Sequence, residues 1–539
     1  MQNFAAAYCA AAPAAAPFLL PQFAQREHRQ RICEHRRQAI PLALQNEFAR
    51  QNPGSKARQE ALGQLADPNT LIVATGQQVG PFLGPLYTLY KAAAAVRIAQ
   101  QLAEETGRPV VPIFWLQTED HDADEIGRCI LPVSDKAANP KSLPMQPHGS
   151  TRASVEHLSY GEEISTVIES LRRILGPTAQ EKLALLCRHY KPGQSPASAF
   201  AGLLLELFTT TPLLVLNPRR ETVARLALPW HRQAIEQHTE IWQALHRRAG
   251  ALHKAQYAVQ ITPRADCCLS FYHPDGFEQA RFRLRPTEQG CELAGHHARL
   301  AYSSLWDTCE QEPRCMSSSA LLRPLIQDAL LPTVAYVAGP GEINYFAQLA
   351  PLYERWSIPM PMIVPRPHVT WLSPKDRQDL ETLHLQSDDL KRPPHILRLI
   401  VAQRSAARGE GPHAQALSRL LAEQRQLVES VESTLRGWRD DLETIDPKLL
   451  RAQEKTMRSI HRNLNKFTNR IEGAGQTADT DSQKCLQRLL CRLRPFAQPQ
   501  ERVHGLPLLL LESTSPQQRI TALLARYRPF STEPIEMDL

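Results

Sequence analysis

The chain has 539 residues, of which 42% are hydrophobic and 22% are charged, and its formal net charge is +7 at pH 7. This length predicts about two to four domains, and a charge this small for the length does not by itself indicate nucleic-acid binding. No apolar run reaches the ~20 residues that a membrane-spanning helix needs. The eleven cysteines form no CxxC pair, which argues against a disulfide framework or a zinc ribbon and favours the reducing cytoplasm.

The start of the chain, residues 1–20, is rich in alanine and has no basic residue before Arg26. It therefore lacks the charged region of a signal peptide. We interpret it as a loosely packed N-terminus that leads into helices over 22–65.

Residues 71–115 predict a strand–loop–helix–strand unit. The apolar runs 71–74 and 110–115 are short enough for buried strands. Between them a loop with three glycines leads to Pro85, which suits the first position of a helix. The helix is expected over 86–105, and Gly107 and Pro109 end it. Two parallel strands joined by a helix are the beginning of an α/β sheet.

Three later apolar runs, 213–217, 330–337 and 361–366, predict further strands, and we take the last of these as the final strand. The run 330–337 is followed by a Gly-Pro-Gly-Glu loop and a helix over 343–356, which repeats the design of the first unit. Runs at 259–262, 268–272 and 280–284 predict a smaller, more antiparallel insertion. His296 and His297 also lie there; on a strand they point apart, and we interpret them as surface residues.

Polar residues follow the first two predicted strands. In an open parallel sheet, ligands bind beyond the carboxyl ends of the strands. The first strand runs into residues 75–78 (Thr-Gly-Gln-Gln), and the second runs into residues 118–122 (Thr-Glu-Asp-His-Asp). The glycines would let backbone N–H groups approach an anion; a tight turn is the alternative, because neither GxGxxG nor P-loop spacing is present. Four carboxylates within 119–124 repel one another, which favours a functional role.

Beyond Ser373, two series of mostly apolar residues alternate spacings of four and three, as in a coiled coil. The first series is Leu417, Leu421, Gln424, Val428, Val431, Leu435 and Trp438, and the second is Leu450, Gln453, Met457, Ile460, Leu464, Phe467 and Ile471. Asp446 and Pro447 separate them, so we expect an antiparallel hairpin. A row of basic residues on the second arm could bind RNA phosphates. The first arm is acidic, however, which favours ion pairs between the two arms or with another subunit.

Several motifs together resemble the bacillithiol biosynthesis cysteine-adding enzymes, from about residue 70 to the C-terminus. The motifs are residues 75–78, 84–91, 114–125, 322–328, 339–349 and 500–502. The resemblance implies an α/β fold: a Rossmann-like parallel-sheet core with connecting insertions, similar to class I aminoacyl-tRNA synthetases, plus an α-helical coiled coil that supports a homodimer. It also implies an amide-forming ligase that joins the carboxyl of cysteine to the amine of glucosaminyl malate.

Such a reaction needs an activated carboxylate, for which ATP is the simplest source; an acyl adenylate and an acyl phosphate both stay open. The predicted catalytic residues are His121, Asp120, Asp122 and Glu119. The predicted substrate- or nucleotide-binding residues are Thr75, Gly76, Gln77, Gln78, Gly84, Tyr87, Lys91, Asp124, Gly339, Gly341, Glu342, Asn344, Tyr345 and Arg366. His121 is expected to act as the base or only to orient a neighbour, and Glu342 to contact substrate or only to cap a helix. Asp120, Asp122 and Asp124 could hold Mg²⁺ or the substrate amines, and zinc on His121 also stays open.

The expected divisions are 1–130 (N-terminal helices and first half of the core), 131–200 (helical insertion), 201–258 (core), 259–320 (smaller insertion with short strands), 321–375 (second half of the core), 376–495 (coiled coil) and 496–539 (C-terminal segment). Cysteine and glucosaminyl malate are the expected partners, with no nucleic acid and no membrane, in the cytoplasm. Two other classes are a tRNA-binding or tRNA-modifying enzyme and a non-catalytic assembly protein; the polar clusters at strand ends argue against the second.

Overall fold

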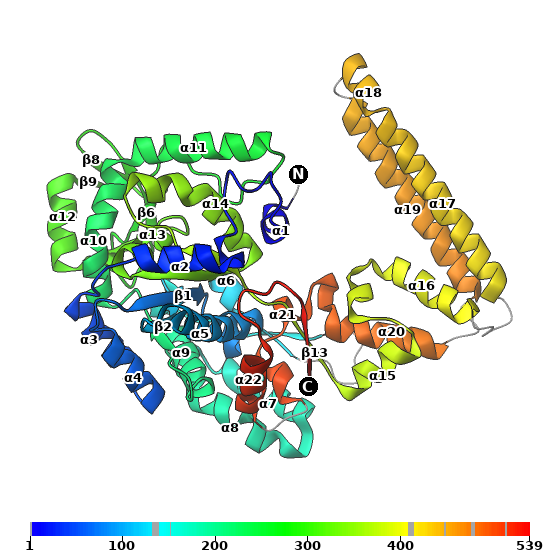
Figure 1. Cartoon of the computed structure of the whole chain (residues 1–539), viewed down its shortest axis with the longest axis horizontal. Coiled ribbons are helices and arrows are strands. Elements are labelled where there is room, and N and C mark those ends of the chain that lie inside the picture. The colour runs from blue at the N-terminus through cyan, green and yellow to red at the C-terminus, as the bar shows by residue number, and fades with distance from the viewer. Residues whose placement is uncertain are drawn as a thin grey trace.

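The computed structural model of the chain describes residues 3–131, 140–150, 152–407, 414–446, 449–475, 480–511 and 515–539. Figure 1 shows an α/β body and a helical region that projects from it and ends in a long pair of helices. The body contains the parallel sheet that positions the candidate site. No helix in the described ranges combines the length and the apolar character that crossing a bilayer requires.

Five parallel strands form the central sheet, in the order β12-β11-β1-β2-β5. They are β1 (Leu71–Gln77), β2 (Val110–Leu116), β5 (Leu214–Leu216), β11 (Thr333–Ala338) and β12 (Met362–Pro365). All five predicted strands of the core are confirmed. Along β2, Ile113 and Trp115 pack into one hydrophobic core, and Phe114 and Leu116 pack into another. Both faces of the sheet are therefore covered, which explains why its strands read as continuous apolar runs.

Two helices make the crossovers next to the site. Helix α5 (Tyr87–Thr106) joins β1 to β2, and α14 (Pro340–Arg355) joins β11 to β12. Helix α5 begins at Tyr87, so Pro85 precedes the helix instead of opening it. Gly107 ends α5 with φ of +67°, and its N–H donates to the carbonyl of Ala103. This left-handed conformation is the one that glycine adopts without strain.

The other helices of the body surround this core (Figure 1). They are α1 (Phe4–Cys9), α2 (Arg26–His35), α3 (Leu42–Gln51), α4 (Lys56–Gln64), α6 (Ala123–Ile126), α7 (Glu163–Leu175), α8 (Ala179–His189), α9 (Pro196–Leu207), α10 (Glu221–Glu236), α11 (His238–Lys254), α12 (Tyr302–Gln311) and α13 (Arg323–Leu330). A short antiparallel pair, β3 (Arg128–Ile130) and β4 (Ser142–Pro144), stands in the insertion after β2.

The N-terminus is packed, so the expectation of a loose segment is wrong. Phe4 and Tyr8 lie on one face of α1 and are buried. The Tyr8 hydroxyl donates to the carbonyl of Ile363 in β12 at 2.6 Å, and the Phe4 ring meets Tyr257 edge-on at 5.1 Å between centroids. Two aromatic residues four positions apart thus anchor an otherwise alanine-rich stretch.

The smaller insertion is an antiparallel sheet in the order β10-β6-β7-β8-β9. Its strands are β6 (Ser270–Tyr272), β7 (Phe282–Pro286), β8 (Gly290–Leu293), β9 (Arg299–Ala301) and β10 (Met316–Ser318). Two details of the prediction are wrong. Residues 259–262 form no strand, and two of them, Gln260 and Ile261, line a pocket. His296 and His297 lie in a turn, where their rings stack 4.4 Å apart instead of diverging.

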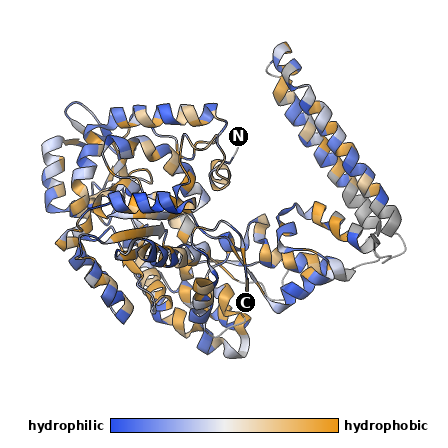
Figure 2. Cartoon of the chain, in the orientation of Figure 1, coloured by the Kyte–Doolittle hydropathy of each residue, from blue (hydrophilic) through white to orange (hydrophobic). Residues whose placement is uncertain are grey.

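The projecting region contains α15 (Pro374–Thr382), α16 (Pro394–Ala407), α17 (Ala414–Gly437), α18 (Arg439–Ile445), α19 (Leu449–Gly475) and α20 (Thr480–Leu493). Helices α17 and α19 lie side by side as the predicted hairpin (Figure 1), and polar and apolar residues alternate along both (Figure 2). The Gln424 amide donates to the carbonyl of Leu464 at 3.2 Å, which ties one arm to the other. Pro447 lies outside the described residues.

Within the hairpin, the described members of the predicted seam between Gln424 and Leu435, and between Leu450 and Leu464, are half-buried. Trp438 and Phe467 are exposed. One ion pair, His461 with Glu432 at 2.9 Å, joins the arms. The others among the described residues run along a single helix, such as Arg425 with Glu429. Pairing of charges between the arms is thus a minor feature, and the coiled-coil geometry stays a prediction.

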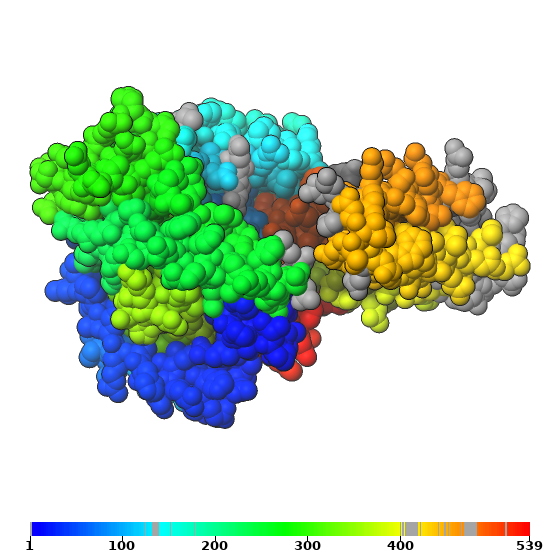
Figure 3. Space-filling model, turned by 90° about the horizontal axis from the view of Figure 1, so that it is seen from above, coloured from blue at the N-terminus to red at the C-terminus, as the bar shows by residue number. Residues whose placement is uncertain are grey.

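The chain then returns to the body through α21 (Gln500–Val503), α22 (Pro516–Arg526) and β14 (Ile535–Asp538). Strand β14 pairs in parallel with β13 (Val369–Leu372). The expectation that the last strand ends at Arg366 is therefore wrong. Figure 3 shows this C-terminal segment, in brown-red, between the body and the projecting helices. The return matters because α21 reaches the candidate site.

Candidate functional site

A pocket of about 380 Å³ lies beyond the carboxyl ends of β1, β2, β11 and β12. The predicted site residues that line it are Gln77, Gln78, Tyr87, Lys91, Glu119, Asp120, Gly339, Gly341, Glu342, Tyr345 and Arg366. The two polar loops that follow β1 and β2 therefore meet, as expected, and the loop after β11 joins them. This is the place where ligands bind in open parallel sheets.

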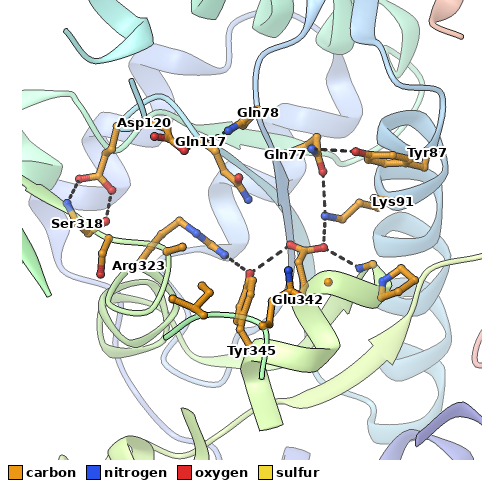
Figure 4. A pocket seen from close by; sticks show the side chains of 18 of the residues that line it. Gln77, Gln78, Tyr87, Lys91, Gln117, Asp120, Ser318, Arg323, Glu342 and Tyr345 are labelled. Atoms are coloured by element: carbon orange, nitrogen blue, oxygen red, sulfur yellow. Dashed lines mark hydrogen bonds and ion pairs between the residues drawn. The ribbon is translucent and has the colours of Figure 1, made fainter. Parts of the chain in front are cut away.

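A buried ion pair joins the first and second halves of the core (Figure 4). Lys91 Nζ, on α5, lies 2.6 Å from Glu342 Oε2, on α14, and also donates to the carbonyl of Gly76 at 2.5 Å. The other face of the pair is held by the Gly339 amide, which donates to Glu342 Oε2 at 2.7 Å. Burial lowers the pKa of Lys91, and the carboxylate beside it opposes that effect. Burial alone would raise the pKa of Glu342, but Lys91 and the Gly339 amide hold it below its usual value.

Two phenols extend this pair towards a second cation. Tyr336 donates to Glu342 Oε1 at 2.7 Å, and Arg323 donates to the Tyr345 hydroxyl at 2.9 Å. Tyr345 in turn lies 3.5 Å from Glu342 Oε1. Burial raises the pKa of Tyr345, so the phenol stays neutral. Glu342 thus caps α14 and also orders the pocket wall, whereas its contact with a substrate stays a prediction.

The acidic cluster after β2 is held by donors from distant elements. The Ser318 amide donates to Glu119 Oε1 at 2.9 Å, and the Ser318 hydroxyl donates to Glu119 Oε2. Asp120 accepts from Arg281 at 2.7 Å and from Gln78 at 3.1 Å. Burial alone would raise the pKa of Asp120, but contact with the His121 ring and the charge of Arg281 keep it well below its usual range. Asp120 is therefore an ionised, partly exposed carboxylate on the pocket wall.

His121 is adjacent to this wall without lining it. Its Nδ1 accepts from Arg281 Nε at 3.0 Å, and the same arginine holds Asp120. A ring nitrogen that accepts carries no proton, so the proton of the neutral ring is on Nε2. Nδ1 can accept another proton only after Arg281 has moved, and this favours the orienting role over the basic one. The basic role stays a prediction.

The remaining predicted residues lie away from the pocket. Thr75 is buried and donates to the carbonyl of Val337 at 2.9 Å, which joins β1 to β11. The Asn344 side chain accepts from the Ala5 amide at 3.1 Å and so holds the N-terminal helix. The Gly76 carbonyl accepts from Lys91, Gly84 lies against the backbone of Pro81 and Gly505, and Asp122 is exposed; none of the three lines the pocket. The side chain of Asp124 lies outside the described part of the structure.

Residues that the sequence did not assign complete the lining. They are Gln117, Gln260, Ile261, Arg281, Ser318, Ser319, Ala320, Arg323, Pro340 and Arg502. Arg323 and Arg502 stand inside motifs that carried the family resemblance, which was a usable signal. Arg281 and Ser318 come from the antiparallel insertion, and no local pattern shows that this insertion covers the site.

The charges of the lining favour an anionic ligand. Its cations are Lys91, Arg281, Arg323, Arg366 and Arg502, against the carboxylates of Glu119, Asp120 and Glu342. The N-terminus of α14 also points its first amides at this edge of the sheet, which adds positive potential. No three His, Cys, Asp or Glu side chains of the described residues are arranged to hold a metal ion. The charges of the pocket lining therefore favour a ligand that presents phosphate or carboxylate oxygens.

Substitution by valine is expected to have different effects at two glycines of the site, Gly76 and Gly341. A Cβ on Gly76 would lie 2.6 Å from the carbonyl oxygen of Trp115 in β2, whereas a Cβ on Gly341 would meet only Gln260, at 3.9 Å. Gly76→Val should therefore lower the thermal midpoint, and Gly341→Val should weaken ATP binding with little change in that midpoint. Thermal unfolding and calorimetric titration with ATP check both. Equal loss of stability in the two variants would contradict the difference.

Comparison with known proteins gives one family. The model described as "Bacillithiol biosynthesis BshC, N-terminal Rossmann-like domain" matches residues 1–367. A BshC protein of Solibacter usitatus is 31% identical over 88% of this chain and 84% of its own length; one of Koribacter versatilis is 30% identical over 87% and 84%. Both are named as cysteine ligases. A solved arginyl-tRNA synthetase structure from Campylobacter jejuni overlaps 92% of this chain and 98% of its own, at 10% identity and a TM-score of only 0.22.

Proposed function

Because the chain belongs to the bacillithiol biosynthesis BshC family, we propose that it is an amide-forming ligase that joins the carboxyl of cysteine to the amine of glucosaminyl malate. Relatives named as cysteine ligases support the first substrate. One structural observation carries the proposal for this chain: an excess of cations lines a pocket at the carboxyl ends of the parallel strands. Both substrates carry carboxylates that such a pocket would hold.

A carboxylate and an amine do not condense in water, so we include ATP in the proposal. When bound, ATP would convert the cysteine carboxyl into an acyl donor with a good leaving group. In this chain, Arg366 and the first turn of α14 line the pocket and would bind phosphate or carboxylate oxygens. Lys91 and Glu342 keep the two loops in register and are already occupied with each other.

The amino group of each substrate needs an anionic contact. We assign this contact to Asp120, which is ionised, reaches the pocket and retains a partly exposed carboxylate. Glu119 is less available because Ser318 engages both of its oxygens. His121 would then act by keeping Arg281, and through it Asp120, in place.

The test is direct. The protein is incubated with cysteine, glucosaminyl malate and ATP, and the products are followed by mass spectrometry. We expect a thiol product with the mass of the two substrates less water, together with AMP or ADP, and none when ATP is omitted. The nucleotide product also identifies the activation route. Absence of the thiol product at all nucleotide concentrations would overturn the proposal.

The alternative of a tRNA-binding enzyme has no comparable support. Arginines of the hairpin, such as Arg436 and Arg458, pair with glutamates on their own helices. A cytoplasmic location remains part of the proposal, because all eleven cysteines are free thiols.

We also propose that the hairpin of α17 and α19 supports a homodimer. Leu427 is 55% exposed and Phe467 is 58% exposed, although both are large and apolar and stand on a projecting element. We expect Leu427→Asp with Phe467→Asp to convert a dimer into a monomer without loss of ATP binding. Light scattering at micromolar concentration measures the change, and Thr456→Asp, at an exposed polar position on α19, is the matched control. A wild-type monomer under these conditions would contradict the proposal.

A further inference from the structure

A turn of the C-terminal segment, residues 500–505, is fixed against the pocket from outside the Rossmann-like segment 1–367. The Gln500 side chain accepts from the Trp371 amide at 3.0 Å and donates to the Trp371 carbonyl at 3.1 Å. The Leu86 amide, just before α5, donates to the carbonyl of His504 at 2.7 Å. Gly505 lies directly against Gly84, where a Cβ would be 3.1 Å from the Gly84 Cα. The turn thus bridges β13 and the loop that follows β1.

Glu501, in the middle of this turn, holds a cation of the pocket. Its Oε1 accepts from Arg366 at 2.7 Å and lies 2.8 Å from His368 Nδ1, and its Oε2 accepts from the Val369 amide at 3.2 Å. The side chains of Arg366 and Glu501 are only 3% and 4% exposed. The Arg366 guanidinium also stacks 4.7 Å above the Tyr87 ring, which lines the pocket. The direction of Arg366 is therefore determined from the C-terminal segment.

The next residue, Arg502, is exposed and lines the pocket itself. Three other lining cations are already matched: Lys91 by Glu342, Arg281 by Asp120 and Arg366 by Glu501. The Arg502 guanidinium has no hydrogen bond or ion pair with any side chain in the described ranges. Its charge and its donors are thus available to a ligand, on a turn whose backbone is held at both ends.

We propose that Arg502 binds an anionic oxygen group of the substrates, a carboxylate or a phosphate, and that Glu501 is the positioning residue that orients Arg366 and this turn towards the same group. The inference deepens the proposed ligase function and rests on it for the identity of the substrates. It makes the C-terminal segment part of the active site, although the strand ends supply most of the lining.

The first experiment compares wild type, Arg502→Gln and Arg502→Lys, with Arg526→Gln as the control because Arg526 is an exposed arginine of α22 away from the pocket. The KM values for ATP, cysteine and glucosaminyl malate are measured separately. We expect Arg502→Gln to raise one of them by about tenfold or more, the cost of losing a charged hydrogen bond, and Arg502→Lys to recover part of the loss. A rise for ATP identifies a phosphate, and a rise for either other substrate identifies its carboxylate. Three unchanged KM values would overturn the inference.

A second experiment measures the binding of ATP alone and of L-malate alone to wild type and Arg502→Gln by calorimetry. The inference then does not depend on turnover. If the wild type does not ligate, the proposed function fails, but weaker binding of either probe to Arg502→Gln still supports the inference. Unchanged binding overturns it, as does a wild type that binds neither probe.

The positioning role is tested with Glu501→Gln and, should that variant not fold, with Glu501→Asp. We expect the same KM to rise as in Arg502→Gln, with kcat changed far less, because a misdirected arginine weakens binding before it affects chemistry. A folded Glu501 variant with unchanged KM values would mean that the residue only supports the fold.

Discussion

Replacement of Lys91 by methionine is expected to lower the free energy of unfolding by about 3–5 kcal/mol, because it leaves the carboxylate of Glu342 buried and unpaired. The two side chains are only 1% and 15% exposed, so water would replace the lost partner poorly. The Gly76 carbonyl also loses its donor. This is the largest effect that we expect from any single change in the core of the site.

The same pair allows a double-mutant cycle. Lys91→Met with Glu342→Gln removes both charges, so it should cost less than the sum of the single changes, with a coupling of about 1–3 kcal/mol. Urea unfolding measures all four proteins. The control is Lys56→Met, whose pair with Glu60 at 3.8 Å is exposed and is expected to contribute less than about 1 kcal/mol. If Lys91→Met remains within about 0.5 kcal/mol of wild type, Lys91 is not the stabilising partner that the geometry indicates.

Acid should weaken the protein partly through Glu501. Burial alone would raise the pKa of Glu501, but the contact with His368 and the charge of Arg366 outweigh it and lower that pKa from 4.5 to about 2. A carboxyl whose folded pKa is depressed contributes stability that is fully present above its unfolded pKa. That contribution is lost as the pH falls from about 4.5 towards 2. At about 1.36 kcal/mol per pH unit, it amounts to roughly 3 kcal/mol.

We therefore expect Glu501→Gln to be less stable than wild type at pH 7 by at least this amount, and the gap to narrow as the pH is lowered below about 4.5. Urea unfolding of both proteins at pH 7, 5, 4 and 3.5 measures the gap. Glu533→Gln is the control, because Glu533 is exposed near the same end of the chain. A gap for Glu501→Gln that stays constant across this range would show that Glu501 is not ionised through contact with Arg366.

The core sheet was predictable from sequence for a physical reason. Both faces of its strands pack against hydrophobic residues, so each strand appears in the sequence as an apolar run. Polar residues begin where this packing ends, as at Gln77 and Gln117. The prediction could not decide which residues of the acidic cluster face the pocket. Asp120 and His121 are adjacent and equally polar, and Arg281, whose position decides between them, is 160 residues further along the chain.

The errors elsewhere have the same origin. Alanine dominates residues 1–20 and so predicts a loose segment, although Phe4 and Tyr8, four residues apart, share a helix face. The site was expected to end at Arg366 because the compositional change beyond Ser373 hides the return of residues 500–505. Long-range packing, which leaves no local period, determines both features.

The position of β1 in the middle of the sheet has a consequence for synthesis of the protein on the ribosome. Its neighbour β11 begins 262 residues later (333 − 71), which corresponds to roughly 13–50 s at about 5–20 residues per second. For that time one edge of β1 lacks its strand partner. Helix α1 lacks its packing partner for longer still, because Tyr8 donates to the carbonyl of Ile363, which is synthesised later than β11. A nascent chain of this protein therefore carries an unpaired β edge through nearly half of its translation and an undocked N-terminus through about two-thirds of it. Chaperones would have most to protect in this period.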